Sequence, residues 1–156
     1  MKSTVDDIDR AILSYLYEDG RMSCSQIAQR VGNISVRTVN NRIRRLTEKG
    51  IVKVRAVAFP EAVGYDIAAD VSIEVEPGKA REVAEGLLKL GRVNYVAIVT
   101  GESDLSVAVY AANPRDLQTF IHEQLQQIPG VRRTKTSLIT EILTRSADWR
   151  IPAELP

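Results

Sequence analysis

The sequence predicts an α+β chain made of an N-terminal helix-turn-helix domain and a C-terminal ferredoxin-like βαββαβ domain. Three observations lead to this prediction: apolar residues at helical spacing as far as residue 50, alternating strand and helix patterns between residues 65 and 145, and a concentration of basic residues in the first part. A chain of 156 residues has room for two small domains with cores of their own. The predicted organisation is a helix-turn-helix domain over 1–50, a hinge strand and linker over 51–64, the ferredoxin-like domain over 65–145 and a tail over 146–156.

The composition argues against several classes of protein. The chain is 44% apolar and 26% charged, as ordinary globular proteins are, which speaks against wholesale disorder. No apolar run approaches the roughly 18 residues of a membrane helix, and the first residues lack the apolar stretch of a signal peptide. With Cys24 as its one cysteine and His122 as its one histidine, the sequence favours neither an internal disulfide nor a metal site. We therefore expect a cytoplasmic protein with no cofactor and no membrane partner.

The formal net charge of +1 conceals an uneven distribution. Residues 1–58 hold 11 Lys and Arg against 6 Asp and Glu, whereas residues 59–156 hold 10 against 14. Between Arg21 and Ala58 there are nine basic residues and one acidic residue. Such an asymmetry indicates a basic binding module joined to a part with another task.

Three helices are predicted before residue 50. The apolar face of the first, over residues 6–17, consists of Ile8, Ile12, Leu13 and Leu16. The second begins at Ser23, with Gln26 as its capping-box partner, and ends at Gly32. The third begins at Ser35 and ends at Gly50, and its apolar stripe consists of Val36, Val39, Ile43 and Leu46. Two helices joined by a tight turn and preceded by a supporting helix form a helix-turn-helix.

The outer face of the third helix carries side chains that suit the recognition of DNA bases. They are Arg37, Thr38, Asn40, Asn41, Arg44 and Arg45. Arg and Asn make paired hydrogen bonds to guanine and adenine edges, and Thr contacts the thymine methyl group. The residues expected to contact phosphates are Arg30, Arg42, Lys49, Lys53 and Arg55. The alternative is a solvated basic face, but such a face usually includes several glutamates and this helix has only Glu48. We therefore expect double-stranded DNA as a partner.

The second part alternates between the periods of strands and helices. Residues 51–59 alternate loosely up to Pro60 and are predicted to form a connecting strand or a hinge. Further strands are predicted over 67–75, 93–99, 105–111 and 131–145, and helices over 79–90 and from 114 to the Pro129-Gly130 pair. This order places both helices on one face of an antiparallel sheet. The other face is predicted to carry Val96, Ile98, Ala108 and Tyr110, and because monomers rarely expose so large an apolar patch we expect a homodimer.

A set of short motifs spans nearly the whole chain. In order they are Asp6-x-x-Asp9-x-x-Ile12-Leu13, Asp19-Gly20-Arg21-Met22-Ser23, Ile27-Ala28-x-x-Val31-Gly32, Ser35-x-x-Thr38-Val39-x-x-Arg42-Ile43-x-x-Leu46, Lys49-Gly50-Ile51-Val52, Val63-Gly64, Thr100-Gly101-Glu102-x-Asp104-Leu105 and Ile128-Pro129-Gly130-Val131-x-x-Thr134-x-Thr136. As a set they resemble the Lrp/AsnC family of feast/famine transcriptional regulators. One departure is the turn Gly32-Asn33-Ile34-Ser35, which is one residue longer than the usual Gly-Leu-Ser and leaves the base-reading residues less firmly assigned.

The resemblance implies a DNA-binding helix-turn-helix domain, a hinge strand and a ligand-binding domain that dimerises and often assembles into octamers. The resemblance also implies that effectors are amino acids or related small molecules, bound between dimers near the loop that matches residues 100–104. The residues that the resemblance assigns to the effector are Thr100, Gly101, Glu102 and Asp104, with Thr134 and Thr136 on the last strand. From the residues alone, an ordinary hairpin turn is the favoured interpretation of this loop, and it is the resemblance that favours a ligand site.

Two other functions compete with ligand-responsive regulation. The first is an enzyme of the same two-domain layout, similar to the sirohaem-type tetrapyrrole decarboxylases. Such an enzyme is expected to carry histidine-bearing motifs in its C-terminal domain, where this chain has only His122. The second is an architectural DNA-binding protein that regulates by assembling with its paralogues. The sequence does not name the effector, the operator, the oligomeric state or the direction of regulation.

Overall fold

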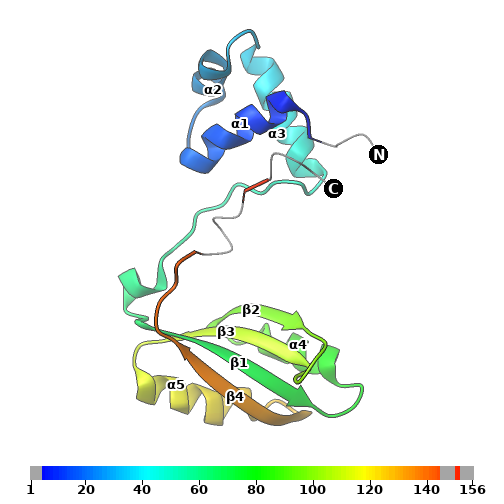
Figure 1. Ribbon diagram of the computed structural model, residues 1–156, viewed down its shortest axis with the longest axis vertical. Coiled ribbons are helices and arrows are strands. Elements are labelled where there is room, and N and C mark those ends of the chain that lie inside the picture. Colours follow the sequence, from blue (N-terminus) through cyan, green and yellow to red (C-terminus); the bar gives the residue numbers. More distant parts are fainter. Residues whose placement is uncertain (1–4, 145–149, 152–156) are drawn as a thin grey trace. The chain divides into compact units, whose positions relative to one another are not determined.

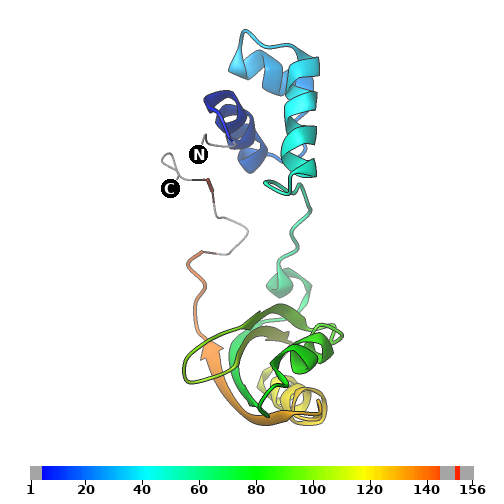
Figure 2. The ribbon, with the colours of Figure 1, turned by 90° about the vertical axis from the view of Figure 1, so that its right-hand side faces the viewer.

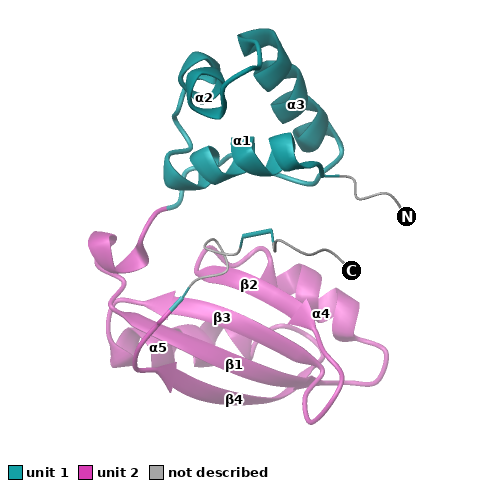
Figure 3. Ribbon diagram, turned by 45° about the horizontal axis from the view of Figure 1, so that its top comes forward, with its two compact units in different colours: residues 1–57, 144–156 teal, residues 58–143 magenta. Residues whose placement is uncertain are grey.

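The computed structural model describes residues 5–144 together with 150 and 151, and the chain divides into two compact units (Figure 3). Unit 1 comprises residues 1–57 and 144–156, and unit 2 comprises residues 58–143. The division falls inside the segment predicted as hinge and linker. Of the predicted tail over 146–156, all but residues 150 and 151 lies outside the described residues.

Unit 1 contains the three predicted helices, α1 (Asp7–Glu18), α2 (Cys24–Val31) and α3 (Val36–Glu48) (Figure 1). Polar side chains begin each of them. Asp6 and Ser23 form capping boxes with the residues three positions later, and the Ser35 hydroxyl accepts a hydrogen bond from the backbone N–H of Thr38. The prediction of a helix-turn-helix domain is confirmed.

The turn between α2 and α3 contains two consecutive residues with positive φ, Gly32 at 72° and Asn33 at 54°. Asn is one of the few side chains that tolerates the left-handed region, so this pair accommodates the additional residue without a break in either helix. The apolar faces of the three helices then form two small cores. One contains Ile12, Ile27, Ala28 and Val39, and the other contains Val5, Leu13 and Leu46 with Ile151 against them.

The prediction of a strand over residues 51–59 is wrong. These residues belong to no strand of the described chain, their side chains are exposed from Lys53 to Phe59, and a single 3₁₀ turn (Pro60–Val63) follows. A strand requires a neighbouring backbone as hydrogen-bonding partner, and alternation in the sequence indicates an extended conformation but supplies no such partner.

Unit 2 is a four-stranded antiparallel sheet in the order β2-β3-β1-β4, with two helices over one face (Figure 2). Its elements are β1 (Ile67–Val75), α4 (Ala80–Leu87), β2 (Val93–Ile98), β3 (Leu105–Ala111), α5 (Pro114–Phe120), which continues as a π-helical turn (Ile121–Leu125), and β4 (Val131–Ile139). The predicted α+β class and ferredoxin-like order are confirmed. Strand β4 ends at Ile139 rather than at residue 145, because its last partner on β1 is Ala68.

The core of unit 2 lies between the sheet and its two helices. Alternate residues of β1 and β3 face this core, together with apolar residues of α4 and α5. The assignment of Val96 and Ile98 to the open face is wrong, since they pair with Val107 and Leu105 and so point to the helix side. A bulge between Val93 and Tyr95 shifts the alternation by one residue. The open face instead carries Tyr95, Ala97, Ala108 and Tyr110.

Candidate DNA-binding surface and effector pocket

The exposed face of α3 carries four of the six side chains predicted to read bases. They are Arg37, Asn40, Asn41 and Arg44. The amide oxygen of Asn41 accepts a 3.4 Å hydrogen bond from Arg44, whose Nε lies 3.9 Å from Glu48. Both partners of this ion pair are more than two-thirds exposed, so the pair contributes little and leaves Arg44 able to exchange Glu48 for another anion.

The other two predicted base readers are engaged within unit 1. The Thr38 hydroxyl lies 2.8 Å from the Ser35 hydroxyl at the start of α3. Arg45 points back toward α1, where it contacts Asp9. Val36, which the helical stripe predicted to face inward, is 49% exposed at the first turn of α3.

Most of the residues predicted to contact phosphates lie before or after α3 in the chain, and one of them, Arg42, lies within it. Arg30 lies over the ring of Tyr15 at 5.6 Å and 3.8 Å from Glu18, a pair that is more than half exposed. Lys49, Lys53 and Arg55 are exposed. Arg42 differs from these, because its side chain is only 22% exposed and its guanidinium is held by two carboxylates.

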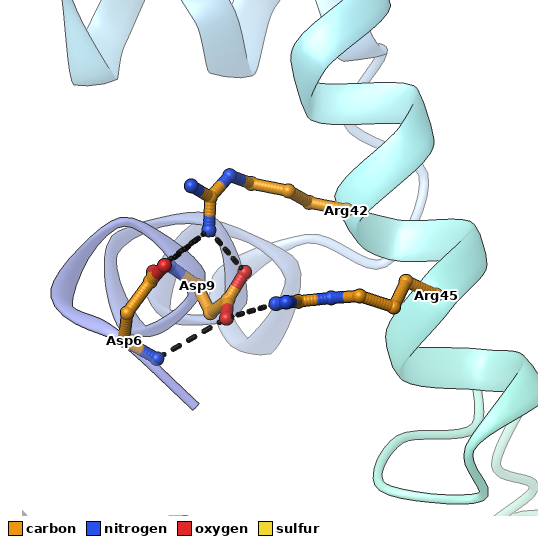
Figure 4. A network of polar contacts seen from close by, with 4 residues as sticks. All are labelled: Asp6, Asp9, Arg42 and Arg45. Atoms are coloured by element: carbon orange, nitrogen blue, oxygen red, sulfur yellow. Dashed lines mark hydrogen bonds and ion pairs between the residues drawn. The ribbon is translucent and has the colours of Figure 1, made fainter. Parts of the chain in front are cut away.

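A network of four charged side chains joins the start of α1 to the middle of α3 (Figure 4). Nη1 of Arg42 lies 2.6 and 2.8 Å from the two carboxylate oxygens of Asp6 and 2.8 Å from Oδ1 of Asp9. Nη2 of Arg45 donates to Oδ2 of Asp9. We call these four residues the acidic clamp. The hydrogen bond from Arg42 lowers the pKa of the Asp6 carboxyl below its usual value, and the backbone N–H of Asp9 acts in the same direction.

From the sequence alone, Asp6 and Asp9 are carboxylates at the start of a helix, where negative charge favours the positive end of the helix dipole. The sequence does contain a sign that Asp9 is buried. Asp9 precedes Ile12 and Leu13 by three and four residues and so lies on the buried face of α1. An aspartate on an apolar stripe needs a cationic partner. The sequence did not say which arginine would supply it.

The loop between β2 and β3 contains the four residues that the family resemblance assigns to the effector. Gly101 adopts a φ of 147°, and a Cβ built at this position would meet nothing within 4 Å. Asp104 is committed to the fold, because its carboxylate accepts a 2.8 Å hydrogen bond from the backbone N–H of Val75 and its own N–H donates to the carbonyl of Ile73. These bonds hold the loop against β1 at the register shift between Glu74 and Val75.

A polar pocket of about 410 Å³ lies between this loop and the open face of the sheet. It is lined by Ser72 and Glu74 of β1, Glu102 and Ser103 of the loop, and Arg133 and Lys135 of β4. Glu102 is therefore the one predicted loop residue that reaches it. Sequence reasoning missed Glu74, Arg133 and Lys135, although strand alternation places them on one face, because their proximity depends on how β4 pairs with β1.

Thr134 and Thr136 face the helix side of the sheet and do not meet the pocket beside the loop. They line a groove of about 420 Å³ between β4 and the last helix, with Leu117, Ile121 and Leu138 as apolar neighbours. Gln126 donates a 2.7 Å hydrogen bond to the Thr134 hydroxyl, and His122 Nδ1 lies 2.8 Å from the Gln126 amide oxygen. Within one chain, then, the loop and the threonine pair belong to two separate sites.

The described residues include no group of three His, Cys, Asp or Glu side chains arranged to hold a metal ion. Among them, no helix is long and apolar enough to cross a membrane.

Comparison with known protein families identifies both units. Residues 5–53 match a winged helix-turn-helix DNA-binding domain, and residues 68–148 match the Lrp/AsnC ligand binding domain. The chain belongs to the Lrp/AsnC family. An uncharacterised HTH-type transcriptional regulator of Pyrococcus abyssi is 42% identical over 90% of this chain and 89% of its own length. The HTH-type transcriptional regulator FL11 of Pyrococcus furiosus is 35% identical over 91% and 93%. This Lrp/AsnC protein is thus a transcriptional regulator with a DNA-binding and a ligand-binding domain.

Two solved structures similar to this chain contain an amino acid. The feast or famine regulatory protein of M. tuberculosis, complexed with L-methionine, is 31% identical with a TM-score of 0.84, over 94% of this chain and 99% of that one. A transcriptional regulator of Neisseria meningitidis in complex with L-Met is 25% identical with a TM-score of 0.85, over 94% and 97%.

Proposed function

We propose that this regulator reads the major groove of double-stranded DNA with α3 and changes its DNA binding when an amino acid occupies the pocket beside the loop at residues 100–104. The observation that carries the proposal is that pocket, which pairs two cations with two carboxylates in a chain similar to two regulators solved in complex with L-methionine.

The proposed base contacts come from the exposed side chains of α3. Arg37, Asn40 or Asn41, and Arg44 follow one another at intervals of three to four residues, so they lie along one line of the helix surface. A recognition helix lies in the major groove with the N-terminal residues of the helix closest to the base edges, and side chains along one line of the helix can then contact successive bases. Arg30, Lys49, Lys53 and Arg55 supply the surrounding phosphate contacts, which set affinity and register but not sequence preference.

The proposed effector chemistry follows from the charges around the pocket. Arg133 and Lys135 suit the α-carboxylate of an amino acid, while Glu74 and Glu102 suit its ammonium group. Arg133 and Glu74 are 3.8 Å apart, and since Arg133 is largely exposed and Glu74 is partly exposed, a zwitterion can replace their mutual contact at little cost. The groove at Thr134 and Thr136 is the second candidate site and would bind a less charged group.

The proposed assembly is a homodimer, with an octamer as a further possibility that the family resemblance implies. Its expected contact is the open face of the sheet, where Tyr95, Ala97, Ala108 and Tyr110 would otherwise remain in water. A two-fold dimer presents two α3 helices to successive major grooves, so its operator is expected to be a pseudo-palindrome. We also propose that the protein is cytoplasmic, because its DNA target lies there.

Two experiments test the proposal. Selection of bound duplexes from a random pool should enrich a pseudo-palindromic sequence, and a pool that remains random would reject specific binding. Thermal unfolding in the presence of each of the twenty amino acids should show stabilisation by at least one, with about 2.7 kcal/mol expected at a hundredfold excess over its Kd. The double variant Glu102→Gln, Arg133→Met should lose this effect. If it responds as the wild type does, the effector binds elsewhere.

A further inference from the structure

We propose that the acidic clamp sets the sequence specificity of DNA binding by holding Arg42 and Arg45 away from the DNA backbone and fixing α3 against α1. The proposal rests on the DNA-binding function of α3 and adds two residues that contact no DNA, Asp6 and Asp9, as positioning residues. Figure 4 shows both arginines of the clamp directed from α3 toward α1, and their carboxylate partners at the start of α1.

The burial of Asp9 makes the clamp a fixed structure. Its side chain is fully buried, and one of its oxygens faces Arg42 while the other faces Arg45. Arg42 extends this pairing to Asp6, whose side chain is 52% exposed. Two successive turns of α3 are therefore tied to one point of α1, which limits both rotation and sliding of the recognition helix.

Stability alone does not explain the choice of charged residues. A buried ion pair usually contributes no more than well-packed apolar side chains of the same volume would. The clamp also leaves Nε of Arg45 buried with no hydrogen-bond partner among the described residues, which is a further cost. What the carboxylates do is neutralise the two arginines that stand on the helix facing DNA.

Neutralising these two arginines lowers the affinity of the protein for DNA of unrelated sequence. Of the four arginines of α3, Arg37 and Arg44 lie on the exposed face, while Arg42 and Arg45 are paired within the clamp. Every further phosphate contact raises the affinity for any sequence and makes the salt dependence steeper by about 0.9 in log K against log salt. Holding two arginines in the clamp keeps affinity for unrelated DNA low without removing a base contact, and so widens the ratio between specific and non-specific binding.

The test uses Asp9→Asn in the full chain. Asn removes the charge but keeps an oxygen that accepts the backbone N–H of Asp6, so the capping box at the start of α1 survives. Binding to the selected operator and to an unrelated duplex is measured by fluorescence anisotropy across a salt series. For the unrelated duplex we expect up to about eightfold tighter binding at 0.1 M salt and a slope steeper by about 0.9, as one freed arginine implies. The operator-to-unrelated affinity ratio should fall.

The matched control is Asp7→Asn, which removes the same charge from the neighbouring, exposed position outside the clamp. If only net charge matters, Asp7→Asn should raise the affinity for the unrelated duplex as much as Asp9→Asn does. That result would overturn the proposal. A purely structural role of Asp9 would weaken binding to both duplexes equally with an unchanged salt slope, and would overturn it as well.

Asp6→Asn decides the matter if Asp9→Asn does not fold. Asp6 is half-exposed, and Asn is as good an N-cap, so the variant removes one of the two carboxylates that hold Arg42 while the helix start remains intact. It should show a smaller rise in non-specific affinity, because Asp9 still pairs with Arg42, and an unchanged specificity ratio would contradict the proposal. A wild-type protein that cannot distinguish the operator from unrelated DNA would instead reject the proposed function itself.

Discussion

Substitution of Asp104 by Ala tests whether the Asp104 side chain holds the loop between β2 and β3 in place when no effector is bound. The variant loses the carboxylate that accepts the 2.8 Å hydrogen bond from the Val75 N–H. Hydrogen bonds to charged groups are worth about 1.5–3 kcal/mol, and because Asp104 is exposed we expect a value at or just below the lower end, about 1–1.5 kcal/mol. For a unit the size of residues 58–143 this corresponds to a decrease in Tm of roughly 5–10 °C.

The direct assay is hydrogen exchange at the amide of Val75 in the absence of any amino acid. In Asp104→Ala the protection of this amide should fall by about tenfold, following from about 1.4 kcal/mol of lost opening free energy. Asp104→Asn keeps an accepting oxygen and should retain most of the protection. If the amide of Val75 exchanges at the same rate in Asp104→Ala as in the wild type, the reasoning is refuted and Asp104 is free to serve the effector alone.

The remaining predictions concern the core, pH and the groove. Phe120→Ala, which removes a fully buried ring below the Arg92 guanidinium, should lower the free energy of unfolding by about 3–5 kcal/mol in denaturant titration, while the exposed neighbour Thr119→Ala should change it little. The hydrogen bond from Arg92 lowers the pKa of Asp116, so the stability that this pair adds over Asp116→Asn should be constant above about pH 5 and should shrink progressively as the pH falls below about 3.9; a difference that does not decrease at all below that pH would contradict this. Gln126→Leu removes the donor to Thr134 and should weaken binding only of ligands that use the groove of β4, with the thermal shift of any ligand in the pocket at Glu102 unchanged.

The helices of unit 1 and the order of elements in unit 2 could be predicted from the sequence, because both follow from local periodicity and from capping residues. Ser23 with Gln26, for instance, predicts the start of α2 from two positions three residues apart. The strand predicted over 51–59 failed for the opposite reason. Pairing depends on a second strand, and local alternation contains no information about it.

The candidate sites could be predicted only in part. The exposed residues of α3 follow from the position of the apolar stripe, which marks the opposite face. The pairing of Arg42 and Arg45 with Asp9 spans more than thirty residues, and the helical period does not say whether an arginine beside the stripe turns toward a neighbouring helix or toward solvent. The bulge at β2 and the register of β4 on β1 similarly decided which side chains share a face.

The most direct test of the account is the binding of wild type, Arg37→Ala and Arg44→Ala to the selected operator and to an unrelated duplex across a salt series, with Arg81→Ala, an exposed arginine of α4, as the control. If α3 reads the bases, each of the first two variants should lose about 1–3 kcal/mol on the operator, or roughly five- to 150-fold in affinity, and much less on the unrelated duplex. Arg81→Ala should bind both duplexes as the wild type does. Equal losses on the two duplexes, or no loss at all, would contradict sequence reading by α3.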